Sequence, residues 1–340
     1  MSKEVFPDDY YKYDVSNFKR YLKGFKDDIR KAYDYNPRNF LNDIDRKSIR
    51  RVLVCGMGGS GIAADLLGVY LDGEVEIITV RDYNLPSSAT SNDLVIISSY
   101  SGNTEEAISC YRSARRTGCQ TVFLSSGGKL QSTSESTNLP FIKMPEGYQP
   151  RCALPYSFFQ TLRILEELAL VKSKEKEVKS VIDYFNKNSL EKVGLDLSEK
   201  LDGKTPLIYT SLKYYPVAFR WKTQFNENAK TLAFANYLSE MNHNELHGFV
   251  NLNSNYHAIF LTFDDDFSRI KKRIDVSKQV ITKHDVTATE LDIKGSLLVK
   301  LMSSVLLGDW VSYYTALRLK TDPTPVDVIE RFKKDLGPFV

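Results

Sequence analysis

The sequence predicts an α/β protein with two doubly wound domains, each a mainly parallel sheet flanked by helices, followed by a C-terminal helical segment. Its 340 residues exceed the usual length of a single domain. From residue 51 onward, short runs that are apolar throughout alternate with helix-like patterns, and the second half of the chain repeats this alternation. Strands that are apolar along their whole length are typical of parallel sheets covered by helices on both faces.

The first predicted domain, with an N-terminal helix, covers residues 1–155. The helix is predicted from apolar residues at helical spacing between Phe18 and Ala32, with Ser16 as its N-cap, and we expect it to pack onto the first domain. The predicted strands are 51–55, 75–80, 93–98, 120–124 and 139–144, and the predicted helices are 60–71 and 104–116.

The remaining chain is divided into three parts. A long helical stretch from Tyr156 to about Lys200 forms a connection over residues 156–200. The second domain, residues 201–320, contains the predicted strands 206–210, 257–263 and 288–293 and the predicted helices 216–230 and 297–318. Residues 321–340 begin with prolines and end as a short helix. In domains of this kind, ligands bind at the carboxyl ends of the strands.

Composition and charge indicate an ordinary soluble globular protein. Apolar residues make up 42% of the chain, charged residues 26%, and the formal net charge is only +3, which argues against a nucleic-acid partner. No run approaches the roughly 20 apolar residues that span a bilayer, and no signal peptide is recognisable, so we expect a cytoplasmic protein without membrane contact. The four cysteines show no CxxC or metal-type spacing, which indicates buried, reduced thiols.

A glycine-rich loop follows the first predicted strand and allows two interpretations. In VCGMGGSGIAAD (54–65), Gly56, Gly58 and Gly61 spell the G-x-G-x-x-G of dinucleotide-binding folds, with Asp82 as a candidate acidic partner after the second strand. Alternatively, Gly58, Gly59 and Ser60 form a cup for a single phosphate at the start of a helix.

A second loop after the next strand favours the phosphate interpretation. Ser99, Ser101 and Thr104 place three hydroxyls around Gly102, directly before a helix. Hydroxyls and free backbone N–H groups at a helix N-terminus suit a compact dianion such as a phosphomonoester. The alternative is a serine-rich surface loop in which Thr104 acts only as an N-cap. Two such loops in one domain favour a monophosphate, because a dinucleotide fold does not require the second one.

The two motifs, GMGGSG followed by S-x-S-G-N-T-E, resemble the sugar isomerase (SIS) domain, a family that binds phosphosugars through these loops. Two such domains over nearly the whole chain resemble the phosphoglucose isomerase superfamily. Within it, the chain is similar to the bifunctional phosphoglucose/phosphomannose isomerases of archaea and some bacteria. Three further stretches carry this similarity, at residues 149–151, 221–228 and 242–245.

The resemblance implies an aldose–ketose isomerase that interconverts glucose 6-phosphate, fructose 6-phosphate and mannose 6-phosphate through a cis-enediol. It implies that Glu227 shuttles the proton, that Arg151 stabilises the enediolate, and that His243 opens the sugar ring from the neighbouring subunit of a homodimer. The pattern Ile329-Glu-Arg-Phe332-Lys333-Lys-Asp-Leu336 resembles a family pattern that has Leu where Phe332 stands. It implies that Lys333 contacts the sugar and completes the active site, with Lys334 as the alternative.

A metal site is the alternative explanation of the histidines. His243 and His247 are spaced i, i+4, but HNELH is not HExxH, and no third ligand has a suitable pattern. We therefore expect no metal and no cofactor. His247 is interpreted as a packing or hydrogen-bonding residue, and Asn244 and Glu245 as residues that orient His243.

Two other functions remain as alternatives. An NAD(P)-dependent oxidoreductase would leave the second loop and the repeated second half without a purpose. A phosphosugar-binding regulatory SIS protein would need a DNA-binding element, and the first 50 residues contain only one convincing helix. The sequence does not rank glucose 6-phosphate against mannose 6-phosphate, because the configuration at C2 is read by the shape of the pocket.

Overall fold

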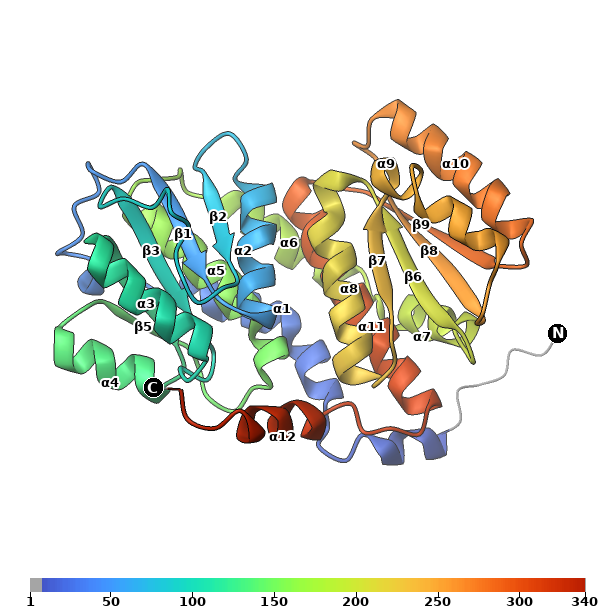
Figure 1. Ribbon diagram of the computed structural model, residues 1–340, viewed down its shortest axis with the longest axis horizontal. Coiled ribbons are helices and arrows are strands. Elements are labelled where there is room, and N and C mark those ends of the chain that lie inside the picture. The colour runs from blue at the N-terminus through green and yellow to red at the C-terminus, as the bar shows by residue number, and fades with distance from the viewer. Residues whose placement is uncertain (1–7, 340) are drawn as a thin grey trace. The chain divides into compact units, whose positions relative to one another are not determined.

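The computed structural model describes residues 8–339 and divides into two compact units (Figure 1). The N-terminal unit consists of residues 24–183. The C-terminal unit consists of the described residues from 184 onward together with those up to Lys23. The boundaries between the units fall inside helices α1 (Lys19–Asp34) and α6 (Glu175–Lys187).

The N-terminal unit is built on five parallel strands in the order β2-β1-β3-β4-β5. The strands are β1 (Arg51–Cys55), β2 (Ile77–Val80), β3 (Asp93–Ser98), β4 (Gln120–Ser125) and β5 (Phe141–Lys143). The helices are α2 (Gly58–Tyr70), α3 (Glu105–Thr117), α4 (Gly128–Thr137) and α5 (Leu154–Glu167). Apolar residues of α3 and α4 pack on one face of the sheet, and α2 packs against α5 and β2. The central strands are buried on both faces, as their apolar composition predicts.

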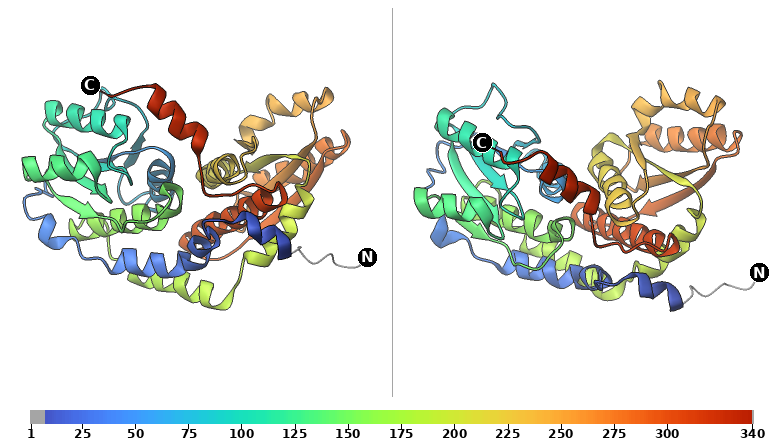
Figure 2. Two further views of the ribbon diagram at one scale, coloured as in Figure 1. Left: turned by 90° about the horizontal axis from the view of Figure 1, so that it is seen from below. Right: turned by 60° about the horizontal axis from the view of Figure 1, so that its bottom comes forward.

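The C-terminal unit is built on four parallel strands in the order β7-β6-β8-β9 (Figure 1). Figure 2 shows the same ribbon from two further directions. The strands are β6 (Thr205–Thr210), β7 (Phe234–Tyr237), β8 (Tyr256–Phe263) and β9 (Thr287–Ile293). The helices are α7 (Glu191–Lys200), α8 (Tyr215–Asn228), α9 (Leu238–Met241), α10 (Ser268–Thr282), α11 (Leu297–Arg318) and α12 (Asp327–Asp335). The long helix α11 packs against α7 and α8 and is buried along most of its length.

Both sheets share one strand order around their first strand. The chain starts at β1 or β6, adds the next strand on one side, and then crosses to the other side with β3 or β8. Ligands of doubly wound sheets bind at this switch point, outside the carboxyl ends of the two strands. The candidate sites are therefore the loops after β1 and β3 in one unit and after β6 and β8 in the other.

The predicted fold class and the predicted strands are confirmed, but the structure contains several helices that were not predicted. The long helical stretch forms three helices, α5, α6 and α7, and the break between α5 and α6 contains a turn at Ala169, which has a φ of +53°. The prediction missed α4, β7, α9 and α10. The sequence of α4 is rich in serine and threonine and has only two buried residues. Strand β7 has four residues at the edge of its sheet.

The prediction of Ser16 as the first N-cap is wrong. The carboxylate of Asp14 instead accepts hydrogen bonds from the backbone N–H groups of Phe18 and Lys19, at 2.5 and 3.0 Å. The position of Asp14 is itself fixed by the hydroxyl of Tyr313, which donates to it at 3.0 Å. A residue further back in sequence could take this role because the chain turns through Asn17, which has a φ of +52°.

All four cysteines are free thiols, and three of them are buried. A buried histidine, His257, lies on β8 and is hydrogen-bonded to the hydroxyls of Thr287 and Thr289 on β9. Burial, with the nearby charges of Lys204 and Lys200, lowers the pKa of His257 to about 4, so the ring is neutral at ordinary pH.

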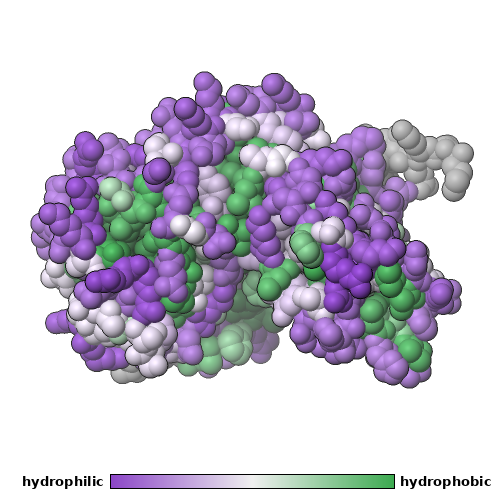
Figure 3. Space-filling view, turned by 90° about the horizontal axis from the view of Figure 1, so that it is seen from above, coloured by the Kyte–Doolittle hydropathy of each residue, from purple (hydrophilic) through white to green (hydrophobic). Residues whose placement is uncertain are grey.

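Along residues 8–339, no helix combines the length and apolar character needed to cross a bilayer. The face in Figure 3 is mainly hydrophilic, and apolar side chains reach it in separate areas.

Candidate active site

The loop after β1 is shaped by glycines that allow backbone segments to approach one another. Gly58 begins α2 with a φ of +49°. A Cβ atom on Gly56 would lie 2.7 Å from the carbonyl oxygen of Ser98, at the end of β3. A Cβ atom on Gly59 would lie 3.1 Å from the carbonyl oxygen of Pro150. Ser60 is buried in the first turn of α2, and its backbone N–H donates to the carbonyl oxygen of the N-cap residue Met57 at 3.1 Å.

The loop after β3 brings together two of the three predicted hydroxyls. The side-chain oxygens of Ser99 and Thr104 are 2.7 Å apart. Thr104 occupies the N-cap position of α3, as predicted, but its hydroxyl makes no capping hydrogen bond and instead faces Ser99. The oxygen of Ser101 accepts a hydrogen bond from the N–H of Asn103 at 3.2 Å, and the Ser101 side chain is exposed. The loop thus presents hydroxyls at the N-terminus of a helix, a suitable site for an anion.

Arg151 lies beside the first of these loops. It belongs to the 3-10 helix η3 (Pro150–Ala153), which leads into α5, and it is buried. A Cβ atom on Gly59 would lie 3.4 Å from the Cα atom of Arg151. The structure therefore brings Gly58, Gly59 and Ser60, the loop with Ser99, Ser101 and Thr104, and Arg151 to one edge of the first sheet.

The residues that the dinucleotide interpretation needs are engaged elsewhere. Arg81 forms an ion pair with Asp65 on α2, and its guanidinium lies against Gly61. The carboxylate of Asp82 accepts a hydrogen bond from the N–H of Tyr83 at 2.6 Å. Both side chains thus already have an intramolecular partner.

Sequence reasoning missed a third loop at the same edge, after β4. The hydroxyl of Ser126 donates to the carbonyl oxygen of Tyr100 at 2.6 Å. A Cβ atom on Gly102, which has a φ of +68°, would lie 1.8 Å from the carbonyl oxygen of Gly127. The run Ser125-Ser126-Gly127-Gly128 directly after a predicted strand was the available signal, since it has the same character as the first two loops.

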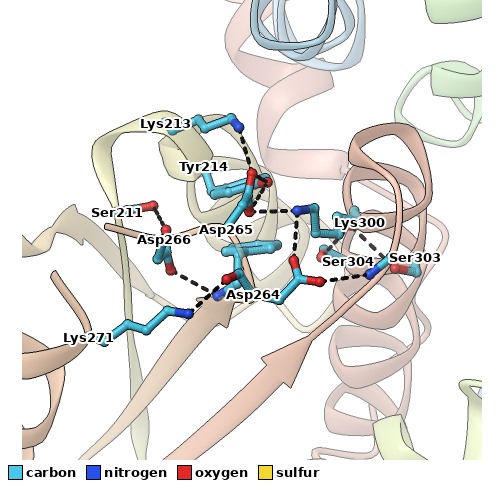
Figure 4. A network of polar contacts seen from close by, with 12 residues as sticks. Ser211, Lys213, Tyr214, Asp264, Asp265, Asp266, Lys271, Lys300, Ser303 and Ser304 are labelled. Atoms are coloured by element: carbon cyan, nitrogen blue, oxygen red, sulfur yellow. Dashed lines mark hydrogen bonds and ion pairs between the residues drawn. The ribbon is translucent and has the colours of Figure 1, made fainter. Parts of the chain in front are cut away.

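The corresponding edge of the second sheet carries an internal ionic network (Figure 4). Three aspartates, Asp264, Asp265 and Asp266, follow β8. The ammonium of Lys300 on α11 lies 2.8 Å from Asp264 and 2.6 Å from Asp265. Lys213 donates to Asp265 at 2.7 Å, and the hydroxyl of Tyr214 does so at 2.8 Å.

The lysine and aspartate charges of this network form ion pairs within the fold. Burial disfavours the charged form of Asp265, but hydrogen bonds from Lys213 and Lys300 hold its pKa below the ordinary value. Burial likewise disfavours the charge on Lys300, but the two aspartates raise its pKa. Asp266 accepts hydrogen bonds from the Ser211 hydroxyl at 2.5 Å and the Phe263 N–H at 2.9 Å. The second switch point is thus closed by its own side chains, and its carboxylates disfavour an anion.

Glu227 lies at the end of α8, in a half-buried position. The ammonium of Lys230 donates to the carbonyl oxygen of Glu227 at 2.7 Å and to that of Pro323 at 2.9 Å. Lys230 has a φ of +54°, so the chain leaves the helix abruptly at this point. The end of α8 is thereby tied to the beginning of the C-terminal segment.

His243 lies in the segment after α9 and is exposed. The backbone N–H of His243 donates to the carbonyl oxygen of Glu240 at 2.9 Å. The neighbouring Glu245 accepts hydrogen bonds from the hydroxyl of Tyr209 at 2.5 Å and from the amide of Asn236 at 2.7 Å. These bonds join the segment to β6 and β7, so Glu245 fixes the backbone next to His243.

The remaining predicted residues lie at the surface. Lys333 and Lys334 are both exposed on α12, whose apolar residues Val328, Ile329 and Phe332 are also exposed. His247 is exposed as well, which contradicts the packing role among the two predicted for it and leaves the hydrogen-bonding role as a prediction. Within residues 8–339, no three or more His, Cys, Asp and Glu side chains are grouped as metal ligands would be.

Comparison with known proteins identifies the class of protein. Residues 191–336 match the family described as the C-terminal SIS domain of bacterial phosphoglucose isomerase. The C-terminal domain of glucosamine-fructose-6-phosphate aminotransferase from Francisella tularensis has a similar fold, with a TM-score of 0.67, 14% identity, and coverage of 94% of this chain and 99% of that one. Tagatose-6-phosphate ketose/aldose isomerase from Escherichia coli gives a TM-score of 0.62 at 15% identity, with 93% of each chain covered. The protein is a tandem SIS-domain protein.

Closer relatives define the family within this class. The bifunctional phosphoglucose/phosphomannose isomerase of Caldicellulosiruptor bescii is 34% identical over 329 residues, covering 91% of this chain and 96% of that one. The protein of the same name from Thermoplasma acidophilum is 32% identical over 322 residues, covering 94% and 97%. The chain belongs to the family of bifunctional phosphoglucose/phosphomannose isomerases, which confirms the resemblance found in the sequence. D-glucosamine-6-phosphate 4-epimerase from Sulfolobus acidocaldarius is 35% identical over 203 residues, covering 59% and 64%.

The close approach at Gly102 gives a testable prediction. Replacing Gly102 with Ala should weaken the binding of inorganic phosphate about tenfold or more, because the new methyl group would push the Ser99–Thr104 loop away from Gly127. Gly118→Ala is a matched control, since Gly118 also has a positive φ, +77°, but its Cβ atom would meet nothing closer than 3.9 Å. Calorimetric titration of both variants with phosphate measures the effect. Equal phosphate affinity in the two variants would contradict this account of the loop.

Proposed function

We propose that the protein is an aldose–ketose isomerase that interconverts glucose 6-phosphate and fructose 6-phosphate, and also mannose 6-phosphate and fructose 6-phosphate. The observation that carries the proposal is the paired hydroxyls of Ser99 and Thr104, 2.7 Å apart, at the switch point of the first sheet. Membership of the isomerase family supports the same substrates.

In this proposal, the 6-phosphate is held by the two loops at the edge of the first sheet. The first loop holds it with Gly58, Gly59 and Ser60, where the backbone N–H groups of the two glycines are the donors, and the second loop adds the hydroxyls of Ser99, Ser101 and Thr104. Two helix N-termini, those of α2 and α3, add favourable dipoles for a dianion. Holding the phosphate fixes one end of the open-chain sugar, so that the reacting carbons are presented in one orientation.

The isomerisation itself needs a base, a cation and a ring-opening group. We assign Glu227 as the base that removes the proton from C2 of the aldose and returns it to C1, through a cis-enediol. Arg151 stabilises the negative charge that develops on the enediolate oxygens. His243 moves the proton between the hemiacetal hydroxyl and the ring oxygen, and Lys333 contacts the sugar near that oxygen. This proton transfer requires neither a metal nor a redox cofactor.

We also propose a homodimer in which His243 serves the active site of the partner. The exposed position of His243 supports this assignment, because the side chain is accessible to another subunit. The bonds from Glu245 to Tyr209 and Asn236 hold the segment in place without covering the histidine.

The free thiols of all four cysteines support a cytoplasmic location.

The direct test of the function is an assay of purified, chelator-treated protein. Glucose 6-phosphate and mannose 6-phosphate should both yield fructose 6-phosphate, whereas glucosamine 6-phosphate should not be epimerised at C4. In D₂O, the product should carry some deuterium at C1, since an enediol route exposes the transferred proton to solvent. Product strictly free of solvent deuterium would contradict the enediol route, and turnover of glucosamine 6-phosphate alone would contradict the substrate assignment.

The role of Glu227 predicts a large loss of activity when its carboxylate becomes an amide. Glu227→Gln should lower kcat by about 10²–10⁴-fold with little change in phosphate binding, because general-base catalysis contributes about that factor. Glu199→Gln is a matched control, since Glu199 is the exposed second-to-last residue of α7, as Glu227 is the second-to-last residue of α8. Steady-state kinetics of both variants decide the assignment. Near-normal kcat in Glu227→Gln would show that another group moves the proton.

Complementation between subunits tests the contribution of His243. Glu227→Gln and His243→Ala chains should each be inactive, and co-expressed heterodimers should regain part of the activity, because one of their two sites is then intact. Differently tagged chains allow the heterodimers to be purified and assayed. Purified heterodimers without recovered activity would place both residues in the site of a single subunit.

A further inference from the structure

Tyr100 joins the loop after β3 to the segment that carries Arg151. It stands between Ser99 and Ser101 in sequence, but its side chain points to the turn at residues 145–148. The hydroxyl donates to the carbonyl oxygen of Pro145 at 2.9 Å and accepts a hydrogen bond from the N–H of Tyr148 at 2.8 Å. One hydroxyl thus bridges both sides of a turn whose sharp bend is at Gly147, with a φ of +88°.

The backbone of Tyr100 is also fixed. Its carbonyl oxygen accepts hydrogen bonds from the N–H of Ser126 at 3.0 Å and from the hydroxyl of Ser126 at 2.6 Å. Tyr100 therefore connects the loop after β3 both to the loop after β4 and to the turn at residues 145–148.

The same turn is anchored on its other side by α1. The hydroxyl of Tyr148 donates to the carboxylate of Asp28 at 2.6 Å, and the hydroxyl of Tyr156 donates to the same oxygen at 3.0 Å. Asp28 is 4% exposed, and the rings of Tyr148 and Tyr156 pack edge to face with centroids 5.3 Å apart. The turn therefore has little freedom to move independently of Tyr100 and Asp28.

Arg151 follows this turn closely. The N–H of Cys152 donates to the carbonyl oxygen of Gln149 at 2.8 Å, which makes the residues between Tyr148 and η3 a compact unit. Pro150 and Arg151 are in turn packed against Gly59. A shift of the turn at Tyr148 is therefore passed on to the backbone of Arg151.

We propose that Tyr100 is a positioning residue that sets Arg151 according to the state of the phosphate loop. A phosphate bound by Ser99 and Ser101 fixes the residues on both sides of Tyr100, and the hydroxyl of Tyr100 carries that order to the turn and so to Arg151. This inference rests on the proposed function, in which Arg151 faces the enediolate. Displacement of a catalytic group by about 1 Å costs on the order of 10²-fold in rate, so a single hydroxyl is sufficient to matter.

Kinetics of Tyr100→Phe test the proposal, because this change removes the hydroxyl and keeps the ring. We expect kcat to fall about tenfold or more, while the inhibition constant of inorganic phosphate changes less than about twofold. Tyr33→Phe is a matched control: Tyr33 lies in the same unit, is 9% exposed, and its hydroxyl makes a 3.0 Å hydrogen bond to Glu166. This control should retain its kcat, and thermal unfolding of both variants confirms that they are folded.

A double-mutant cycle separates positioning of Arg151 from a general effect. In the background of Arg151→Ala, adding Tyr100→Phe should lower kcat by less than about twofold, because the group that Tyr100 positions is absent. An equal loss in both backgrounds would overturn the proposal. A parallel loss of phosphate affinity and kcat in Tyr100→Phe would also overturn it, since Tyr100 would then shape the phosphate site itself.

Hydrogen exchange tests the coupling without any turnover. In wild-type protein, saturating inorganic phosphate should slow amide exchange in peptides from both 98–104 and 145–151. In Tyr100→Phe it should slow exchange only in 98–104. Phosphate protection of 145–151 that survives the substitution would overturn the coupling. A wild-type protein without isomerase activity would contradict the proposed function. The exchange experiment would still decide whether Tyr100 couples the two segments, because it does not depend on turnover.

Discussion

The close approach of backbone segments at the carboxyl edge of the first sheet is the constraint on which the candidate site depends. A Cβ atom on Gly56 would lie 2.7 Å from the carbonyl oxygen of Ser98, and one on Gly102 would lie 1.8 Å from that of Gly127, so neither position has space for a side chain. A Cβ atom on Gly59 would make a tight contact of 3.1 Å with the carbonyl oxygen of Pro150. Three loops and the Arg151 segment can converge there only because these positions are glycine. The convergence places helix N-termini, hydroxyls and a guanidinium-bearing residue at one edge, and the anion-binding chemistry follows from it.

The two units share one strand topology but carry different side chains at the carboxyl edges of their sheets. Each has its switch point between the first strand and the strand that crosses over, but only the first sheet has Ser- and Gly-containing loops there. In the second sheet, Lys300 neutralises Asp264 and Asp265 within the fold. A buried cation paired in this way stabilises the unit only as long as both carboxylates remain, because an unpaired buried charge is costly. In the C-terminal unit, Glu227 lies at the end of α8 and His243 in the segment after α9, away from this ionic network in sequence.

The sequence was sufficient for the features that depend on local pattern. Apolar strands and the Ser- and Gly-containing loops are local, so the fold class and the loops at 58–60 and 99–104 could be predicted. The hydrogen bonds that hold Tyr148 could not, since Tyr100 and Asp28 are far from it in sequence and only tertiary folding brings them together. Helix α10 was missed because its basic residues obscure the few apolar ones, and β7 because a four-residue edge strand has little pattern. The sequence does not choose between Lys333 and Lys334, because they occupy adjacent helix positions with the same local pattern.

The position of the phosphate group in a crystal structure of the protein with fructose 6-phosphate tests the central claim most directly. The account predicts phosphate oxygens within about 3 Å of the hydroxyls of Ser99, Ser101 and Thr104, with the N-termini of α2 and α3 directed at the group. It further predicts that the ion pairs of Lys300 remain intact and that no sugar phosphate enters the edge of the second sheet. A phosphate group bound at the carboxyl ends of β6 and β8, with the loop at Ser99 empty, would contradict the account.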